Sequence, residues 1–386
     1  MRVLIDYRPA LRERSGVGEY MHNLVLAYAH QHVADGTEVA VFTSSWKDRP
    51  AAGLSTDLAA RVVDRRVPVR VLNFLWHRLE WPPLETLGIA VDVVHAAHPL
   101  LIPSRDAAQV VTIHDLFFLH DPLATRAEIR RDYPELARAH AARADAIVVN
   151  SRYTASLVQR TFGVPPARVH VCSPGPPSWR RLGRAPNLPH GGYVLFLGTL
   201  EARKNVGALL DAYGSLIEQK KQPAPLVIAG KATADAAGWL ERLSRPPLAG
   251  HVRHLGYVPV AQREDLYAGA RLLVTPSRDE GFGIPVLEAM SAGIPVIAAD
   301  RGALPEVLGD AGVLVDPDDV PVLAAAMHRM LTDEAFAADC AKRGLARAQE
   351  FSWDRAAKVL HGAYEAAIAN KHSRHPTAPH RDVHPA

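Results

Sequence analysis

The sequence predicts an α/β protein with two doubly wound, parallel-sheet domains that face each other across a cleft. Three observations lead to this fold class. Short apolar runs alternate with helical patterns along most of the chain, as in βαβ units. The alternation stops once, in a stretch rich in Pro and Gly over residues 173–192, and then begins again. The 386 residues, of which 48% are hydrophobic, are enough for two separate cores.

The first half of the chain has the strand and helix order of a doubly wound domain. It opens with the apolar run RVLIDY, a glycine-containing loop, and a helical pattern that begins at Met21. We expect a first domain over residues 1–175 and a linker over residues 176–192. Further apolar runs predict buried strands at residues 38–43, 91–96, 109–114, 146–150 and 168–172.

The second half repeats this order of strands and helices. Its apolar runs predict strands at residues 193–198, 225–230, 252–256, 271–277, 294–299 and 312–317. Two helical patterns follow, over residues 320–349 and 353–370. We expect a second domain over residues 193–352, a closing helix over residues 353–371 that packs back toward the first domain, and a disordered polar tail over residues 372–386.

Composition and charge exclude several classes of protein. The net charge of +3 is too small for a nucleic-acid binder, and no apolar run reaches the length of a membrane-spanning helix. Asp6 interrupts the N-terminus before a signal-peptide core could form, so we expect a cytoplasmic protein. The two cysteines, Cys172 and Cys340, have no metal-like spacing and predict no disulfide. Basic and aromatic residues alternate over residues 70–81, as on a solvated helix edge or on a surface that contacts lipid headgroups or an acceptor.

A pair of acids brackets a glycine loop in the stretch EGFGIPVLEAMSAGIPVIAAD. Glu280 lies in the loop after a predicted strand, and Glu288 lies one turn inside a helix that Pro285 would begin and Gly293 would end. A helix start after glycines suits an anion, and carboxylates suit the hydroxyls of a sugar or ribose. A helix cap with one surface Glu is the alternative for this stretch alone.

Three further motifs follow predicted strands. FLGTLEARKNV contains Arg203 and Lys204, which together suit a diphosphate, although a solvated basic turn is the alternative. RSGVGEY contains Gly16 and Gly18, whose backbone could face a phosphate, but it lacks the third glycine of a dinucleotide site. VTIHDLFF ends a strand at His114 and Asp115, which would point at the cleft as polar contacts or, for His114, as a general base.

Together these motifs resemble the retaining glycosyltransferases of the GT-B fold, family GT4, over about residues 1–370. The resemblance implies sugar contacts from Glu280 with Phe282 and Gly283, ribose binding by Glu288, and diphosphate binding by Arg203 and Lys204. It also implies that the backbone of Gly16, Val17 and Gly18, and that of Ile284, contacts the donor. His114, next to Asp115, would contact the transferred sugar. Thr199 stands where many members have Arg, so the phosphate charge would rest on the basic pair.

The resemblance implies transfer of a hexose from a nucleoside diphosphate sugar, GDP-mannose as the first choice, to a hydroxyl of a glycan or lipid-linked acceptor. The first domain would bind the acceptor, with specificity in loops around residues 70–81 and 125–133. We expect retention of configuration, neither a metal nor a cofactor, no nucleic-acid partner, and peripheral contact with the cytoplasmic face of the inner membrane. The stretch DPDD at residues 316–319 is expected to be a turn before a helix. A nucleotide-sugar epimerase and a non-catalytic nucleotide-sugar-binding subunit remain as alternatives.

Overall fold

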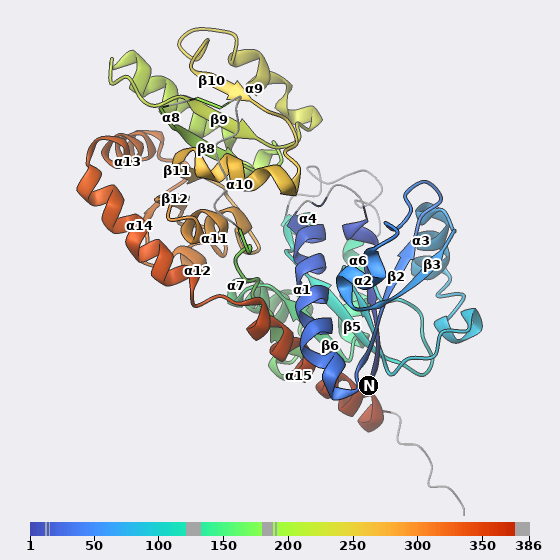
Figure 1. The fold of residues 1–386 in the computed structure, drawn as a ribbon. Helices are drawn as coiled ribbons and strands as arrows, with labels where there is room; N and C mark the ends of the chain where they lie inside the picture. Colours follow the sequence, from blue (N-terminus) through green and yellow to red (C-terminus); the bar gives the residue numbers. More distant parts are fainter. Residues whose placement is uncertain (12–13, 15, 121–132, 180–187, 190, 375–386) are drawn as a thin grey trace, which may run out of the picture.

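Two parallel sheets, one in each half of the chain, form two lobes that lie against each other (Figure 1). The computed structural model describes residues 1–11, 14, 16–120, 133–179, 188–189 and 191–374. Most of the predicted acceptor loop at residues 125–133, part of the predicted linker and residues 375–386 of the predicted tail lie outside the described residues. Within them, the expected α/β class with two doubly wound sheets is confirmed.

The first sheet has the strand order β3-β2-β1-β4-β5-β6-β7, and every neighbouring pair is parallel. Its strands are β1 (Arg2–Asp6), β2 (Glu38–Ser44), β3 (Arg61–Arg65), β4 (Val93–Ala96), β5 (Ala108–Ile113), β6 (Ala146–Val149) and β7 (Val169–Val171). The second sheet has the order β10-β9-β8-β11-β12-β13 and is also parallel. Its strands are β8 (Tyr193–Leu197), β9 (Leu226–Ala229), β10 (Val252–His254), β11 (Ala270–Thr275), β12 (Val296–Ala299) and β13 (Val313–Val315).

Helices cover both faces of each sheet, so the central strands are apolar on both sides. For example, all four residues of β6, β9 and β12 are buried, which explains why these strands read as short continuous apolar runs. The helices of the first sequence half are α1 (Gly16–His32), α2 (Leu54–Leu58), α3 (Val69–Arg78), α4 (Phe117–His120), α6 (Tyr133–Arg143) and α7 (Arg152–Phe162). Those of the second half are α8 (Val206–Glu218), α9 (Ala237–Arg242), α10 (Val260–Ala268), α11 (Ile284–Ser291), α12 (Leu304–Leu308), α13 (Val320–Thr332), α14 (Glu334–Ala348) and α15 (Trp353–Arg374).

Short 3-10 helices complete the connections. They are η1 (Arg8–Ala10), η2 (Val33–Asp35), η3 (Leu84–Leu87), η5 (Pro166–Arg168), η6 (Ala202–Lys204) and η7 (Ala234–Ala236). The strand order reverses between β1 and β4 in the first sheet and between β8 and β11 in the second. In open α/β sheets, ligands bind outside the carboxyl ends of the strands at such reversals.

Four boundaries differ from those expected. The strand β3 was missed because its mixed sequence RVVDR is that of a partly exposed edge strand. The first helix begins at Gly16 rather than Met21, so the glycine motif forms its first turn. The helical pattern over residues 320–349 is two helices, because Asp333 caps a new one by accepting from Phe336 N. The last helix continues to Arg374, so the first three residues of the expected disordered tail are helical.

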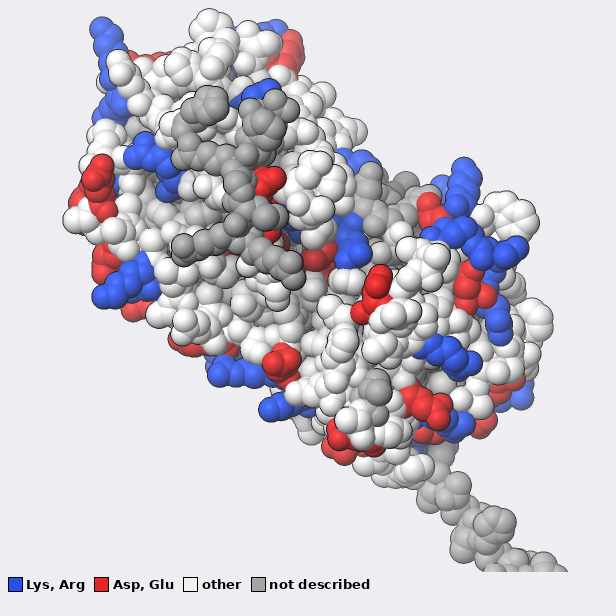
Figure 2. All heavy atoms as spheres, viewed as in Figure 1, with Lys and Arg blue, Asp and Glu red and all other residues white. Residues whose placement is uncertain are grey.

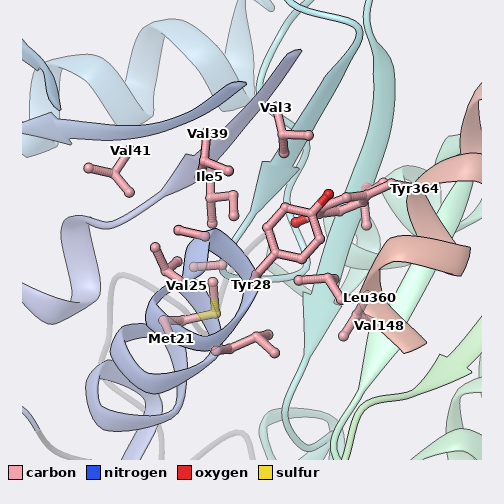
Figure 3. Packing of buried hydrophobic residues seen from close by; sticks show 14 of the residues in the cluster. Val3, Ile5, Met21, Val25, Tyr28, Val39, Val41, Val148, Leu360 and Tyr364 are labelled. Atoms are coloured by element: carbon pink, nitrogen blue, oxygen red, sulfur yellow. The ribbon is translucent and has the colours of Figure 1, made fainter. Parts of the chain in front are cut away.

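The last helix, α15, lies in the first lobe although it follows the second lobe in sequence (Figure 1). Leu360 and Tyr364 pack in one core with Val25 and Tyr28 of α1 and with residues of β1 (Figure 3). The Tyr364 hydroxyl also lies 2.8 Å from Nδ1 of buried His95.

The chain passes twice between the lobes, and the two crossings touch. A Cβ placed on Gly175, in the first crossing, would lie 2.3 Å from the backbone nitrogen of Trp353, where the second crossing ends. Only glycine fits this close approach. The two crossings therefore form one joint between the lobes.

Candidate active site

Two cations and one acid meet at the carboxyl edge of the second sheet. Arg203 and Lys204 lie in η6 after β8, and Glu280 lies in the loop after the neighbouring strand β11. Lys204 Nζ donates to Glu280 Oε1 at 2.5 Å, and Arg203 Nη1 donates to Glu280 Oε2 at 3.3 Å. Glu201 Oε1 accepts from Arg203 Nε at 2.7 Å. Two buried or half-buried acids thus balance two cations at the strand-order reversal.

Mutual charge compensation sets the protonation of this cluster. Burial by itself would raise the pKa of Glu280, but Lys204 and Arg203 outweigh it and hold that pKa below its ordinary value. Burial, together with the neighbouring Arg203, lowers the pKa of Lys204, and Glu280 acts in the opposite direction. Glu280 is therefore an ionised acceptor at neutral pH, fully engaged by two cations.

The start of α11 lies directly after this acid, as the sequence predicted. Gly283 caps the helix with φ +95, a left-handed conformation that favours glycine, and a Cβ there would lie 2.6 Å from Leu304 Cδ2. Ile284 is the first helical residue, so the first turn leaves backbone N–H groups without intrahelical partners. The Phe282 side chain points away into the apolar core, which leaves only its backbone for a ligand.

Glu288 lies in the second turn of α11, buried and held by two partners from α10. Its Oε2 accepts from the Tyr267 hydroxyl at 2.7 Å, and its Oε1 lies 3.6 Å from Arg263 Nη1. Burial raises the pKa of Glu288 despite these partners. Arg263 Nη2 in turn donates to the carbonyl of Arg14 at 2.9 Å, so this acid lies close to the first lobe.

The first lobe presents His114 and Asp115 to the glycine loop of the second. A Cβ on Gly281 would lie 2.0 Å from the carbonyl oxygen of His114 and 3.2 Å from Asp115 Cβ, so the two backbones touch. His114 Nε2 lies 3.1 Å from the carbonyl of Ala97, and its ring packs edge-on against Tyr20. Burial lowers the pKa of His114, so the imidazole is neutral at pH 7. The glycine loop before α11 was expected to suit an anion; in the structure its Gly281 also allows the close approach of the opposite lobe.

The N-terminus of α7 fixes the same glycine loop from the first lobe. Ser151 Oγ donates to the carbonyl of Gly281 at 2.6 Å, and the Tyr153 hydroxyl donates to Asp279 Oδ1 at 3.3 Å. In return, Glu306 of α12 accepts from the backbone N–H groups of Arg152 and Tyr153 at 2.9 and 3.0 Å. A carboxylate at a helix start is favourable, so this contact couples the orientation of the lobes to the loop that carries the acid.

The remaining expected site residues have looser geometry. Gly16 and Val17 are exposed at the first turn of α1, with open space around Gly16. A Cβ on Gly18 would lie 2.5 Å from the carbonyl oxygen of Pro9, so this glycine is required by packing whatever it binds. The Thr199 carbonyl accepts from Glu201 N within the turn after β8. The expected turn at residues 316–319 is confirmed, because Asp319 caps α13 by accepting from Val322 N.

Several polar residues of this region were not among the expected ones. Asp279 directly precedes Glu280, and Glu201 lies two residues before Arg203, both in loops after strands, so the same rule could have found them. Burial and the nearby Asp115 raise the pKa of Asp279. The others come from helices that the sequence does not connect to the site: Tyr153 of α7, and Arg263 and Tyr267 of α10.

Known proteins are similar to this chain in both sequence and architecture. Residues 14–176 match the family described as Glycosyltransferase Family 4, and residues 191–333 match Glycosyl transferases group 1. The O-antigen chain mannosyltransferase B of Escherichia coli is 33% identical over 387 residues, which covers 95% of this chain and 100% of that protein.

Solved structures agree on the fold. Sucrose-phosphate synthase from Thermosynechococcus elongatus superimposes with a TM-score of 0.76 at 20% identity, over 96% of this chain and 99% of its own. HepE of Anabaena, in complex with UDP-glucose, superimposes with a TM-score of 0.67 at 20% identity, over 97% and 100%. The resemblance noted from the motifs is thus confirmed, and this chain belongs to family 4 of the glycosyltransferases and has their GT-B fold.

Proposed function

We propose that this glycosyltransferase moves a mannose-like hexose, with retention of configuration and without a metal, from a nucleoside diphosphate sugar to a hydroxyl of a glycan or lipid-linked acceptor. GDP-mannose is the first candidate donor, and synthesis of a cell-surface polysaccharide is the proposed process. The E. coli relative, an O-antigen chain mannosyltransferase by name, supports the choice of hexose and process. HepE in complex with UDP-glucose supports a nucleotide-sugar donor.

One observation carries the proposal: the Arg203–Lys204 pair and the Glu280 carboxylate are in direct contact beside the start of α11. A sugar diphosphate supplies both kinds of group that this cluster needs. Its phosphates would take over the two cations and the free N–H groups of the helix start, and its sugar hydroxyls would donate to the released carboxylate. Glu288 would accept from the ribose hydroxyls of the same donor.

The chemistry follows from where charge develops. The bond between the sugar C1 and the diphosphate oxygen breaks, and the electron pair leaves with the phosphate. Arg203, Lys204 and the helix start would stabilise that added negative charge. The acceptor oxygen forms the new bond to C1 on the same face, and its proton passes to the leaving phosphate. Neutral His114 would hold a sugar hydroxyl without adding a charge.

A membrane face is the second part of the proposal. Among the described residues, no helix combines the length and apolarity that crossing a bilayer requires. The amphipathic helix α3 and the segment after it nevertheless expose large apolar side chains: Phe74 in the helix and Trp81 beyond its end are each 58% exposed. Lys and Arg side chains gather in this part of the surface, with some Asp and Glu between them (Figure 2), and basic residues beside an apolar face are typical of helices that lie on anionic membranes. We propose that α3 rests on the cytoplasmic face of the membrane and brings the cleft to a lipid-linked acceptor.

A donor screen with matched variants tests the transferase. GDP-, UDP-, ADP- and dTDP-sugars are compared for protection against thermal unfolding, and the protecting donor is then assayed with a mannooligosaccharide acceptor in EDTA. Lys204→Ala should lower kcat/KM by at least about tenfold, ~1.4 kcal/mol, because one phosphate contact is lost. Lys342→Ala, an exposed lysine of α14, is the control. Equal activity in both variants would remove the basic pair from the site.

Product analysis addresses the alternatives in the same assay. An epimerase would convert the donor into an isomeric nucleotide sugar with no acceptor present. A non-catalytic binding subunit would be protected by the donor but release no nucleoside diphosphate. Transfer with inversion of the anomeric configuration would agree with a transferase but contradict the proposed retention of configuration.

A further inference from the structure

A pocket of about 600 Å³ lies in the first lobe, at the end of the sheet opposite the active site. Gln109, near the start of β5, and Asp145, just before β6, line it. His114 follows the other end of β5, roughly 17 Å away along the strand. The pocket is therefore separate from the transfer site.

Four cations line this pocket against two acids. Arg105 is exposed, and its side chain pairs with no acid in the described part of the chain. Lys371 Nζ donates to the carbonyls of residues 105 and 107, which leaves it a third N–H group. Arg374 donates to the carbonyl of Arg143 and lies 3.6 Å from Asp145. The balance of charge in the pocket is positive.

The remaining acid and cation form one wall. Arg143 makes two hydrogen bonds to the Glu80 carboxylate, at 2.6 and 3.1 Å. Glu80 has φ +47, a strained conformation for a residue with a side chain. The ion pair holds the Glu80 carboxylate in this polar wall, next to the end of α3.

The rim of the pocket is part of the proposed membrane face. Leu79 and Trp81 line the pocket, and each is 58% exposed. They continue the exposed apolar side of α3 beyond Phe74. The buried Trp76 also lines the pocket, and its indole N–H has no partner among the described residues. A ligand in this pocket would meet exposed apolar and cationic side chains together at the mouth, above the buried Trp76.

We propose that this pocket binds the phosphate of an anionic phospholipid headgroup while α3 lies on the membrane. The inference rests on the proposed membrane contact. Excess positive charge favours an anion over a neutral glycan, and aromatic and aliphatic side chains at the mouth suit the boundary between headgroups and acyl chains. Because the pocket and the cleft lie at opposite ends of the first sheet, a lipid held here would anchor the lobe without blocking the acceptor.

Vesicle binding of the full chain tests the proposal. Co-sedimentation is measured with vesicles of phosphatidylcholine alone and with vesicles that contain phosphatidylglycerol, at 0.15 M salt to limit diffuse attraction. The double variant Arg105→Ser, Arg374→Ser should lose about tenfold in affinity for the phosphatidylglycerol vesicles and keep its affinity for the neutral ones. The charge-matched control is Arg242→Ser, Arg245→Ser, at and just after the end of α9 in the second lobe.

The outcomes separate the pocket from the membrane contact. If the pocket and control variants lose the same affinity for phosphatidylglycerol vesicles, binding depends on the overall positive charge, and the proposed headgroup site is wrong. Binding of wild type to both vesicle types without preference would also overturn it but keep the membrane contact, which Phe74→Ser should weaken on both vesicles. If the protein binds neither type of vesicle, both the membrane contact of α3 and the headgroup site are wrong. The proposed transferase activity is tested separately and is not affected by this result.

A soluble probe tests the pocket directly. Glycerol 1-phosphate should change the fluorescence of Trp81, measured with the donor site blocked by nucleoside diphosphate, and the change should be absent in Trp81→Phe. The pocket double variant should show the same loss. A mannooligosaccharide that causes the change when glycerol 1-phosphate does not would identify a glycan site and overturn the proposal.

Discussion

The two lobes share one architecture but use different polar chemistry. The second lobe places charged groups at its reactive edge: Lys204 and Arg203 with Glu280, and Arg263 with Glu288. The first lobe buries neutral imidazoles instead. In the described part of the chain, the histidines whose pKa burial lowers all lie in the first lobe: His22, His77, His95, His98, His114, His140 and His170.

At the cleft, where neutral His114 meets the second lobe, this difference matches the two proposed substrates. A diphosphate needs cations that are held in place, and acids near them keep those cations from repelling each other before the donor binds. A glycan acceptor carries hydroxyls, which neutral donors and acceptors can hold without a charge to compensate. The first lobe has a buried ion pair as well, but Arg8 and Asp6 satisfy each other in a bidentate contact.

The largest difference between the lobes is expected in how their stability depends on pH. Burial lowers the pKa of His22 and of His140 to about 4, whereas unfolded histidine titrates near 6.5. Below pH 6.5 the unfolded chain binds these protons first, so stability falls as the pH drops toward 4, by at most roughly 3 kcal/mol for His140 and by less for the partly exposed His22. Glu288, whose pKa is raised, has the opposite sign and favours the folded second lobe as its carboxyl protonates.

Thermal unfolding followed from pH 7 to pH 4.5 measures this effect. The first lobe should unfold at a lower temperature as the pH falls, and His140→Gln should flatten the dependence. If the second lobe loses stability first, the contrast between the lobes does not extend to their stability.

Glu280→Gln should show the next largest effect and sharpen the role of charge in the second lobe. The amide cannot replace an ionised acceptor for sugar hydroxyls, so kcat should fall by about 100-fold, ~2.7 kcal/mol. Nucleoside diphosphate binding should persist or tighten, because Lys204 and Arg203 lose their internal partner. Turnover and calorimetric binding measure the two effects, with exposed Glu218→Gln as control. Loss of diphosphate binding in Glu280→Gln would contradict a sugar-binding role.

Gly281→Ala tests the backbone contact between Gly281 of the second lobe and His114 of the first. The added methyl group would lie 2.0 Å from the His114 carbonyl, so the lobes must move apart. We expect a cost of about 1–3 kcal/mol in stability and a lower kcat with a more open molecule in small-angle scattering. Gly238→Ala, where the new Cβ meets open space, is the matched control. An unchanged kcat in Gly281→Ala would show that this contact does not set the active geometry.

The smallest effect is expected for Tyr267→Phe. Losing the hydroxyl leaves Glu288 with one partner and should weaken donor binding by about 1 kcal/mol, roughly fivefold. Tyr213→Phe loses a buried hydrogen bond in the same lobe but far from the donor, so only its stability should change. Equal donor affinities in the two variants would argue against ribose binding at Glu288.

Much of the fold was predictable because parallel strands buried on both faces read as short apolar runs. Two of the exceptions were the edge strand β3, which contains charged residues, and the first turn of α1, whose glycines are typical of a loop. In neither segment does the local sequence pattern indicate the observed strand or helix strongly enough to outweigh the low strand or helix propensity of its residues.

The site was predictable where it follows strands and unpredictable where helices supply it. Arg203, Lys204 and Glu280 could be placed in one region because neighbouring parallel strands end at one edge. Their direct ion pairing, the Tyr267 partner of Glu288 and the α7 contact with Gly281 depend on how helices and lobes pack. Single-sequence patterns do not contain that information.

The return of α15 to the first lobe has a consequence for synthesis. The amino-terminal core lacks one of its walls until Leu360 and Tyr364 have been made. At translation rates of about 5–20 residues per second, the stretch from residue 172 to residue 374 takes roughly 10–40 s. During that interval the ribosome holds a nearly complete second lobe beside a first lobe with an open apolar seam. Truncation before Trp353 should therefore produce aggregation through the amino-terminal half, although every residue of that half is present.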